Sequence, residues 1–231
     1  MNIKDLEKVF GIEITDEELF KKALTHSSYT KENALSSLLN YERLEFFGDA
    51  VLKLAVSEIL IDKFPTSNEG ELTKIRSIIV SDATLSVVAK ELGLEKYLIL
   101  GKNAEKSGER TRASINACAV EAIIGAYFLT GKKTEIVDFL GRIFEPKILD
   151  VKNNFAKYNA KEILQEYTQG KTKELPEYHL VREFGPQHDP SFEIEVIYQN
   201  KVLACEIGKS KKEAEQKCAY EACKKLGVIN E

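Results

Sequence analysis

Three carboxylates lie in an otherwise apolar stretch in the first quarter of the chain. Glu42, Glu45 and Asp49 belong to the segment YERLEFFGD (41–49), which continues as AVLKLAV (50–56). A stretch this apolar is expected to form a largely buried helix. At about 100° per residue, the three acids fall within an arc of roughly 60° and share one face. Like charges gathered on such a face are unfavourable without a cation, so the pattern points to a divalent metal ion bound by oxygen.

The competing interpretation is a solvated charged stripe on an amphipathic helix. Arg43 does not neutralise the acidic face, because adjacent helical residues do not face each other. The neighbouring residues are also too apolar for a fully exposed face. Both observations favour the metal-site hypothesis.

A second apolar helix carries one further acid. Glu121 is the single charge in the segment SINACAVEAIIGAY (114–127), and a buried lone carboxylate is rare without a partner. The small residues of this helix would let another helix approach closely; they are Ala117, Ala119, Ala122, Gly125 and Ala126. If Glu121 comes to lie beside Glu45 and Asp49, the result is a carboxylate cluster suited to a metal.

Glu69 marks a third acidic position, in the segment NEGELT (68–73). Acids are favourable at a helix N-terminus for electrostatic reasons alone, so this residue has a simple structural explanation.

The composition excludes several classes of protein. The 231 residues are 43% hydrophobic and 30% charged, with a net charge of −4, so a nucleic acid would have to be bound by a local basic patch. The cysteines form no CxxC pair and the three histidines are scattered, which argues against a zinc cluster, a disulfide framework or a histidine-based triad. His26 is expected to structure a helix terminus. We find no membrane span and no signal-peptide core, and we expect a cytoplasmic protein.

The elements that position these acids are helical over the first two-thirds of the chain. Helical periodicity recurs in five segments after residue 40, namely 41–62, 70–80, 82–92, 112–130 and 134–145. We therefore predict an all-α domain over residues 1–150.

The pattern changes after Pro146. Residues 151–158 are polar and are predicted to be a linker. A helix over 160–168 is followed by strand-like alternation and a final helix; the strands are expected at 178–184, 192–198 and 201–207, and the last helix at 211–226. This order predicts a small α+β domain, α-β-β-β-α, over residues 159–228.

The sequence resembles bacterial ribonuclease III, the double-stranded-RNA endonuclease. The segment ERLEFFGDA (42–50) is similar to the signature of that family, and other family segments follow in the same order and spacing: LTHSSY (24–29), NEGELTKIRSIIV (68–80) and VEAIIGAYFL (120–129). Residues 164–170, 176–196 and 208–226 resemble a double-stranded-RNA-binding domain. The resemblance covers nearly the whole chain.

The resemblance implies roles for the residues identified above. Glu45, Asp49 and Glu121 would be catalytic acids that bind metal, with Mg²⁺ as the cofactor and Mn²⁺ as a substitute. Glu42 and Glu69 would support them, and Phe46 would enter a socket on the partner subunit of a homodimer, although an ordinary core aromatic is the alternative. The implied reaction is hydrolysis of double-stranded RNA to 5′-phosphate and 3′-hydroxyl ends, in ribosomal and messenger RNA processing.

Cys118 departs from the family pattern, which has an aspartate at this position. Residues i and i+3 share a helical face, so Cys118 faces the same side as Glu121. Thiols are poor ligands for Mg²⁺. The alternative function is therefore a duplex-RNA-binding protein in which cleavage is weakened or lost.

The small domain is expected to supply RNA affinity. The resemblance assigns minor-groove contacts to Gln165 and His188. Lys209, Lys211 and Lys212 stand at the start of the last helix, where backbone amides also favour phosphate. A solvated helix end is the simpler explanation of this lysine run in isolation.

Overall fold

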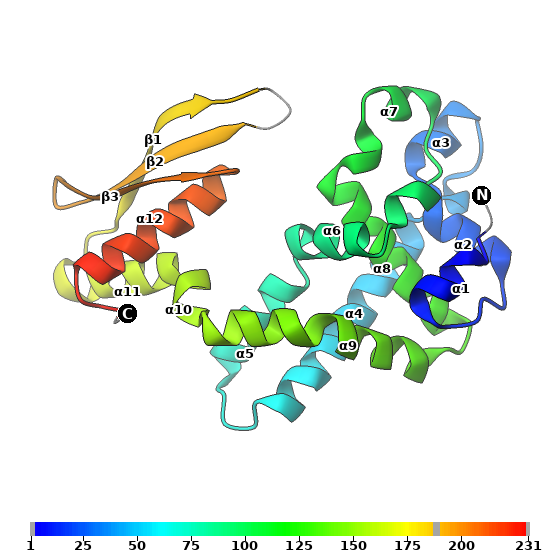
Figure 1. Ribbon diagram of the computed structural model, residues 1–231, viewed down its shortest axis with the longest axis horizontal. Coiled ribbons are helices and arrows are strands. Elements are labelled where there is room, and N and C mark those ends of the chain that lie inside the picture. Colours follow the sequence, from blue (N-terminus) through cyan, green and yellow to red (C-terminus); the bar gives the residue numbers. More distant parts are fainter. Residues whose placement is uncertain (1–2, 187–189, 230–231) are drawn as a thin grey trace. The chain divides into compact units, whose positions relative to one another are not determined.

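The computed structural model describes residues 3–186 and 190–229. The chain divides into two compact units, Met1–Asp150 and Val151–Glu231. Figure 1 shows that the first unit is helical and that the second combines helices with a sheet. The predicted order, an all-α domain followed by a small α+β domain, is confirmed.

The first unit consists of helices and short 3₁₀ turns. In chain order they are α1 (Asp5–Phe10), α2 (Glu17–Leu24), α3 (Ser27–Glu32), η1 (Ser37–Leu39), α4 (Glu42–Lys63), α5 (Glu69–Ile79), α6 (Asp82–Glu91), η2 (Leu94–Tyr97), α7 (Lys102–Lys106), η3 (Glu109–Thr111), α8 (Ala113–Leu129) and most of α9 (Lys133–Asn153). The helices that carry the acids, α4 and α8, begin and end within one residue of their predicted limits.

Helix α8 forms the centre of this unit. Eleven of its 17 residues are buried, and it lies against α2, α4 and α6 (Figure 1). A helix that is apolar on all sides is stable only where neighbours cover it on all sides. The small residues on α8 do allow close approach, because Gly125 lies directly against the backbone of α4.

His26 structures a helix terminus, as predicted. Its Nδ1 accepts a hydrogen bond from the backbone N–H of Ser28 and caps α3.

The predicted end of the last helix of this unit was wrong. Helix α9 continues through Pro146 to Asn153, although proline removes one helical hydrogen bond. Phe144, Ile148 and Val151 are buried at spacings of four and three residues, so burial of one apolar face outweighs the local cost of the proline. The expected linker at 151–158 is consequently helical: it comprises the end of α9 and α10 (Phe155–Tyr158).

The second unit has the predicted α-β-β-β-α order. Its elements after α10 are α11 (Ala160–Thr172), β1 (Glu177–Phe184), β2 (Ser191–Tyr198), β3 (Lys201–Gly208) and α12 (Lys211–Lys225). The strands form an antiparallel sheet in the order β1-β2-β3. The turn between β2 and β3 places Gln199 and Asn200 at φ +51° and +57°, which matches a type I′ hairpin turn.

One face of this sheet is covered by helices. Helix α12 packs against β2 and β3, and α11 packs against α12 (Figure 1). Ile194 and Val196 of β2 are buried together with Leu164 and Cys218. Within the described ranges 3–186 and 190–229, every helix is too short or too polar to span a bilayer.

Candidate active site and RNA interface

Backbone contact between two helices brings the predicted catalytic acids together. Gly48 lies on α4 between Glu45 and Asp49, and its missing side chain leaves room for the backbone of α8. A Cβ atom built on Gly48 would stand 1.8 Å from the carbonyl oxygen of Glu121. The helices can therefore meet at this level only because residue 48 is glycine, and the contact places Glu121 beside the acidic turn of α4.

The electrostatics of Glu121 reflect this arrangement. Burial, followed by the charges of Asp49 and Glu45, raises the pKa of the Glu121 carboxyl to about 8. Burial also raises the pKa of Glu45, and the charges of Glu42 and Asp49 add to the shift. A cluster of acids that raise one another's pKa values is a favourable place for a cation.

Cys118 is hydrogen-bonded into the cluster. Its Sγ donates to Oε1 of Glu45 over 3.2 Å. Burial and this bond to Glu45 raise the pKa of the Cys118 thiol to about 12. Burial, followed by the neighbouring Cys118 and Glu45, raises the pKa of the Tyr41 hydroxyl well above its usual range. The thiol thus keeps its proton and holds the Glu45 carboxylate in place.

Asp49 is paired with a lysine one turn further along α4. Its Oδ2 forms an ion pair with Nζ of Lys53 over 2.6 Å. Among the described residues, no group of three or more His, Cys, Asp or Glu side chains stands ready to hold a metal. Glu45, Asp49 and Glu121 still have the chemistry that a hard divalent cation requires, because carboxylate oxygens are its preferred ligands. A metal ion bound by Asp49 would compete with its ion pair to Lys53.

The supporting acids differ in their placement. Glu42 is exposed at the first position of α4, and its charge contributes to the raised pKa of Glu45. Glu69 is exposed at the first position of α5, where Oε1 accepts a hydrogen bond from the Thr73 hydroxyl over 2.8 Å. Glu69 therefore makes a local hydrogen bond within the first turns of its own helix.

Asp82 is a further acid that sequence reasoning missed. It is the first residue of α6, a helix that packs against α8, and its charge raises the pKa values of both Glu45 and Glu121. In the sequence, Ser81 and Asp82 have the ordinary form of a helix cap followed by an acidic first turn. The packing of α6 against α8 is what brings this charge toward the cluster.

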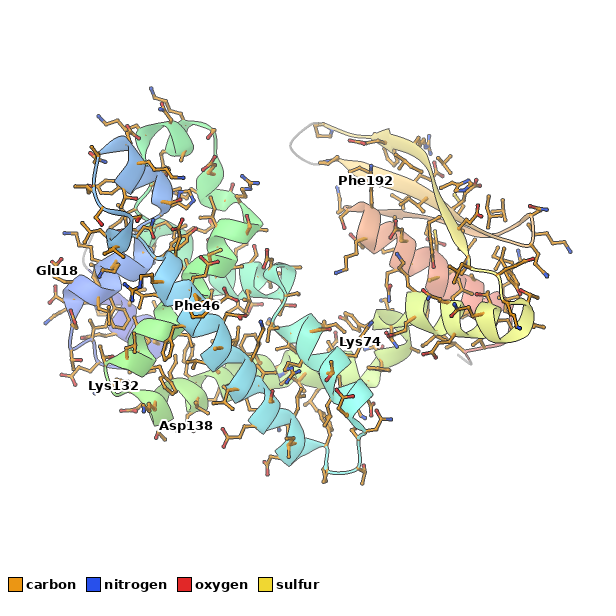
Figure 2. The ribbon with its side chains drawn as sticks, turned by 180° about the vertical axis from the view of Figure 1, so that it is seen from behind. Glu18, Phe46, Lys74, Lys132, Asp138 and Phe192 are labelled. Atoms are coloured by element: carbon orange, nitrogen blue, oxygen red, sulfur yellow. The ribbon has the colours of Figure 1, made fainter. Side chains whose placement is uncertain are left out.

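Phe46 lies outside the core. Its side chain, labelled in Figure 2, has 81% of its area exposed. Leu54 and Ile61 on the same helix are 64% and 65% exposed. At helical spacing these three residues fall on one side of α4, and we call them the α4 apolar stripe. The alternative that Phe46 is an ordinary core aromatic is wrong.

The second unit presents the predicted basic residues at one helix start. Lys211 and Lys212 are exposed in the first turn of α12, and Lys209 precedes it. Ser210 caps this helix by accepting a hydrogen bond from the N–H of Glu213 over 3.2 Å. The Lys211 ammonium stands 5.7 Å from the ring centre of Phe192, which Figure 2 labels.

One of the two predicted minor-groove residues lies in the described part of this unit. Gln165 is exposed on α11. His188 lies outside the described residues.

Comparison with known proteins identifies the family. Residues 16–147 match the ribonuclease-III-like family, and residues 160–226 match the double-stranded RNA binding motif. This chain belongs to the ribonuclease III family. The ribonuclease 3 of Listeria welshimeri is 40% identical over 223 residues, which cover 96% of this chain and 97% of that protein. The ribonuclease 3 of Streptococcus uberis is 41% identical over 222 residues, covering 96% of each chain.

A solved structure supports the same conclusion for the first unit. The nuclease domain of the Campylobacter jejuni ribonuclease III superposes with a TM-score of 0.58 at 36% identity. The match covers 63% of this chain and 97% of that structure. Membership of the ribonuclease III family makes this chain an endoribonuclease, and its second unit is a double-stranded RNA binding motif.

Proposed function

We propose that this ribonuclease III family member hydrolyses double-stranded RNA with Mg²⁺ as its cofactor, and that Mn²⁺ can substitute. The products would carry 5′-phosphate and 3′-hydroxyl ends, and the substrates would be ribosomal precursor and structured messenger RNAs. The observation that carries the proposal is the contact of Gly48 with the Glu121 backbone, which places Glu121 beside Glu45 and Asp49.

Each side chain of the site has a role in this proposal. Glu45, Asp49 and Glu121 hold the metal, and Glu42 and Glu69 add negative charge around it. A bound divalent ion supplies an activated water and neutralises charge on the phosphate. Asp49 forms an ion pair with Lys53, with which a bound ion would compete for the carboxylate. Glu45 and Glu121 are half-buried, so their charges are less screened by water than exposed ones and attract a cation more strongly.

The division of labour follows the two units. Residues 1–150 form the catalytic and dimerisation domain, residues 159–228 form the RNA-binding domain, and the helical segment 151–158 joins them. Gln165 and His188 contact the minor groove, and Lys209, Lys211 and Lys212 contact phosphates. The cytoplasmic location stays a prediction from the sequence.

The enzyme would act as a homodimer. Exposed apolar side chains on one side of a helix are favourable sites for burial against a second chain, and the α4 apolar stripe supplies three of them, with Phe46 at one end. The solved Campylobacter jejuni structure is described as having a region involved in dimer formation. A dimer would bring two acidic clusters to one duplex.

A second function is favoured by Cys118. This residue occupies a position next to Glu45 where another oxygen ligand for Mg²⁺ would stand. If its thiol weakens Mg²⁺ binding enough, the protein would hold duplex RNA without cutting it.

One cleavage experiment separates the two functions. A long duplex RNA is incubated with the wild type, Glu121→Gln and Cys118→Asp across Mg²⁺ and Mn²⁺ titrations. We expect cleavage by the wild type and a loss on the order of a hundredfold in Glu121→Gln. Digestion of the products by a 5′-phosphate-dependent exonuclease checks the chemistry of the ends.

Glu18→Gln is the matched control. Glu18 is exposed on α2, a helix that carries neither the acids of the site nor the α4 apolar stripe, and its substitution should leave cleavage unchanged. Binding of the same RNA in the presence of a chelator is measured in parallel. Binding without cleavage in the wild type, together with cleavage by Cys118→Asp, would establish the second function and overturn the first.

A further inference from the structure

A row of polar side chains runs along α4 from Asp49. Lys53 and Ser57 follow Asp49 at intervals of four residues, so the three side chains lie on one side of the helix. Nζ of Lys53 is 2.6 Å from Oδ2 of Asp49, and the Ser57 hydroxyl donates to the backbone carbonyl oxygen of Lys53 over 2.6 Å. The row therefore begins at an acid of the proposed cutting site and extends about 12 Å along the helix axis.

Helix α5 adds an arginine at the far end of this row. It follows α4 after a short turn and packs against it (Figure 1). Arg76 is half-buried, and its Nη1 donates to the Ser57 hydroxyl oxygen over 2.8 Å. A guanidinium has five N–H donors, and within residues 3–186 and 190–229 Arg76 makes this one hydrogen bond and no ion pair. Because a cation withdrawn from water is ordinarily paired with an anion, Arg76 has donors available for an anionic ligand.

The acids of the cutting site repel the substrate that they have to approach. An RNA strand carries a negative charge at every phosphate, and the net charge of −4 gives the chain no general attraction for it. Cations beside the acids lower this repulsion and fix the position of the strand. Lys53 and Arg76 lie on the row that starts at Asp49, and a guanidinium can bind two phosphate oxygens at once through parallel N–H groups.

We propose that Lys53 and Arg76 bind backbone phosphates of the duplex RNA next to the phosphate that is cut, and so set the position of the strand at Asp49. Ser57 holds the Arg76 guanidinium on the side of α4 that carries the acid. Both cations bind the substrate and take no part in the proton transfers of hydrolysis. Their role rests on the proposed function, which takes Asp49 as part of the cutting site.

The binding experiment uses the full-length Glu121→Gln chain, in which duplex RNA should stay intact in the presence of Mg²⁺. Affinity for one labelled duplex is measured at several salt concentrations. Arg76→Gln and Lys53→Met should each reduce the slope of log affinity against log salt by about 1 in magnitude. Arg76→Lys keeps the charge and should keep the slope. Arg142→Gln is the charge-matched control, because Arg142 is exposed on α9 over the ring of Phe139, and it should leave the slope unchanged.

The cleavage experiment separates phosphate binding from a purely structural role. In the otherwise wild-type chain, Arg76→Gln should raise KM about tenfold and leave kcat within about threefold, because a contact made equally in the ground state and the transition state changes KM alone. Ser57→Ala removes the hydrogen bond between α4 and α5 but keeps both cations. It should leave KM within about twofold of the wild-type value.

An unchanged salt slope in Arg76→Gln, or an equal rise in KM in Ser57→Ala, would overturn the proposal, because Arg76 would then serve only to join the two helices. Loss of the dimer in Arg76→Gln, measured by sedimentation velocity, would also overturn it, because the anionic partner would then belong to a second copy of the chain. Failure of the proposed function has a different signature, in which the wild type cuts no RNA although the salt slopes of the Glu121→Gln variants differ as expected.

Discussion

Glu121 shows how burial and neighbouring charge prepare a carboxylate for a cation. Its pKa of about 8 arises from burial first and from Asp49 and Glu45 second. The same carboxyl is ordinary in the unfolded chain, so the folded protein binds an additional proton between the two pKa values. This proton links the stability of the metal-free protein to pH.

We predict that the metal-free protein loses stability as pH rises from about 5 to 9. The folded pKa of Glu121 lies above its unfolded value, so its stabilising contribution is complete below the unfolded pKa and disappears as pH passes through about 8. After allowance for partial solvent screening, the change should be about 1–2 kcal/mol. Urea unfolding at a series of pH values in the presence of a chelator measures it.

Glu121→Gln should flatten this pH dependence, because an amide does not titrate. Glu58→Gln, an exposed position on α4, should leave the slope unchanged. A wild-type stability that rises across this pH range would contradict the assignment of the titration to Glu121.

At the scale of elements, the site depends on the contact between α4 and α8. Gly48 faces the Glu121 carbonyl oxygen, and a Cβ on Gly125 would stand 2.6 Å from the carbonyl oxygen of Leu44. Both atoms that the added groups would meet belong to the backbone, which cannot rotate away as a side chain can. The two glycines therefore set the distance between the helices and, with it, the separation of the acids.

We predict that Gly48→Ala destabilises the protein although alanine favours helix formation. The added methyl group forces α4 and α8 apart, at a cost of about 1–3 kcal/mol or more, and it should also weaken metal binding. Denaturant unfolding measures the first effect and calorimetry the second.

Gly141→Ala is the matched control for Gly48→Ala. Gly141 lies within α9, and a Cβ built on it meets nothing within 4 Å. This substitution should be neutral or stabilise by about 0.5–1 kcal/mol. Equal effects of the two substitutions would show that helix propensity, rather than the contact between helices, decides the outcome at position 48.

At the scale of the whole molecule, each unit leaves a surface suited to a different partner. The first exposes the α4 apolar stripe, and the second exposes lysines at the start of α12. The net charge of −4 does not favour nucleic acid, so RNA affinity has to come from local contacts.

We predict that Leu54→Glu shifts the protein from dimer to monomer. A buried glutamate without a partner would cost several kcal/mol in an apolar interface, whereas an exposed glutamate in the monomer costs little. Sedimentation velocity measures the state. Leu175→Glu is the control, because Leu175 is 54% exposed in the second unit, and it should leave the assembly unchanged. A Leu54→Glu protein that stays dimeric would place the interface away from the α4 apolar stripe.

We predict that replacing Lys211 and Lys212 by alanine weakens duplex RNA binding without changing its sequence preference. For every lysine that no longer binds a phosphate, the slope of log affinity against log salt should decrease in magnitude by about 1. Fluorescence anisotropy with one labelled duplex over several salt concentrations gives the slope. Lys201→Ala, at an exposed position where β3 begins, serves as control. Equal slopes for all variants would remove α12 from the RNA interface.

Local periodicity made many of the helices and strands of this protein predictable from its sequence. The helical face shared by Glu42, Glu45 and Asp49, and the strand alternation of the second unit, repeat over a few residues and are visible in the sequence alone. The limits of α4 and α8 could be predicted for the same reason. The extension of α9 through Pro146 could not be predicted, because the burial of Phe144 and Ile148 outweighs the tendency of proline to end a helix.

The tertiary structure decided the remaining features, because they depend on which distant segments pack together. The exposure of its side chain shows that Phe46 is not a core aromatic. The packing of α6 against α8 brings the Asp82 charge toward the acids. The hydrogen bond from Cys118 to Glu45 joins residues 73 positions apart. Periodicity shows which face a residue occupies, whereas close packing of the helices determines what that face meets.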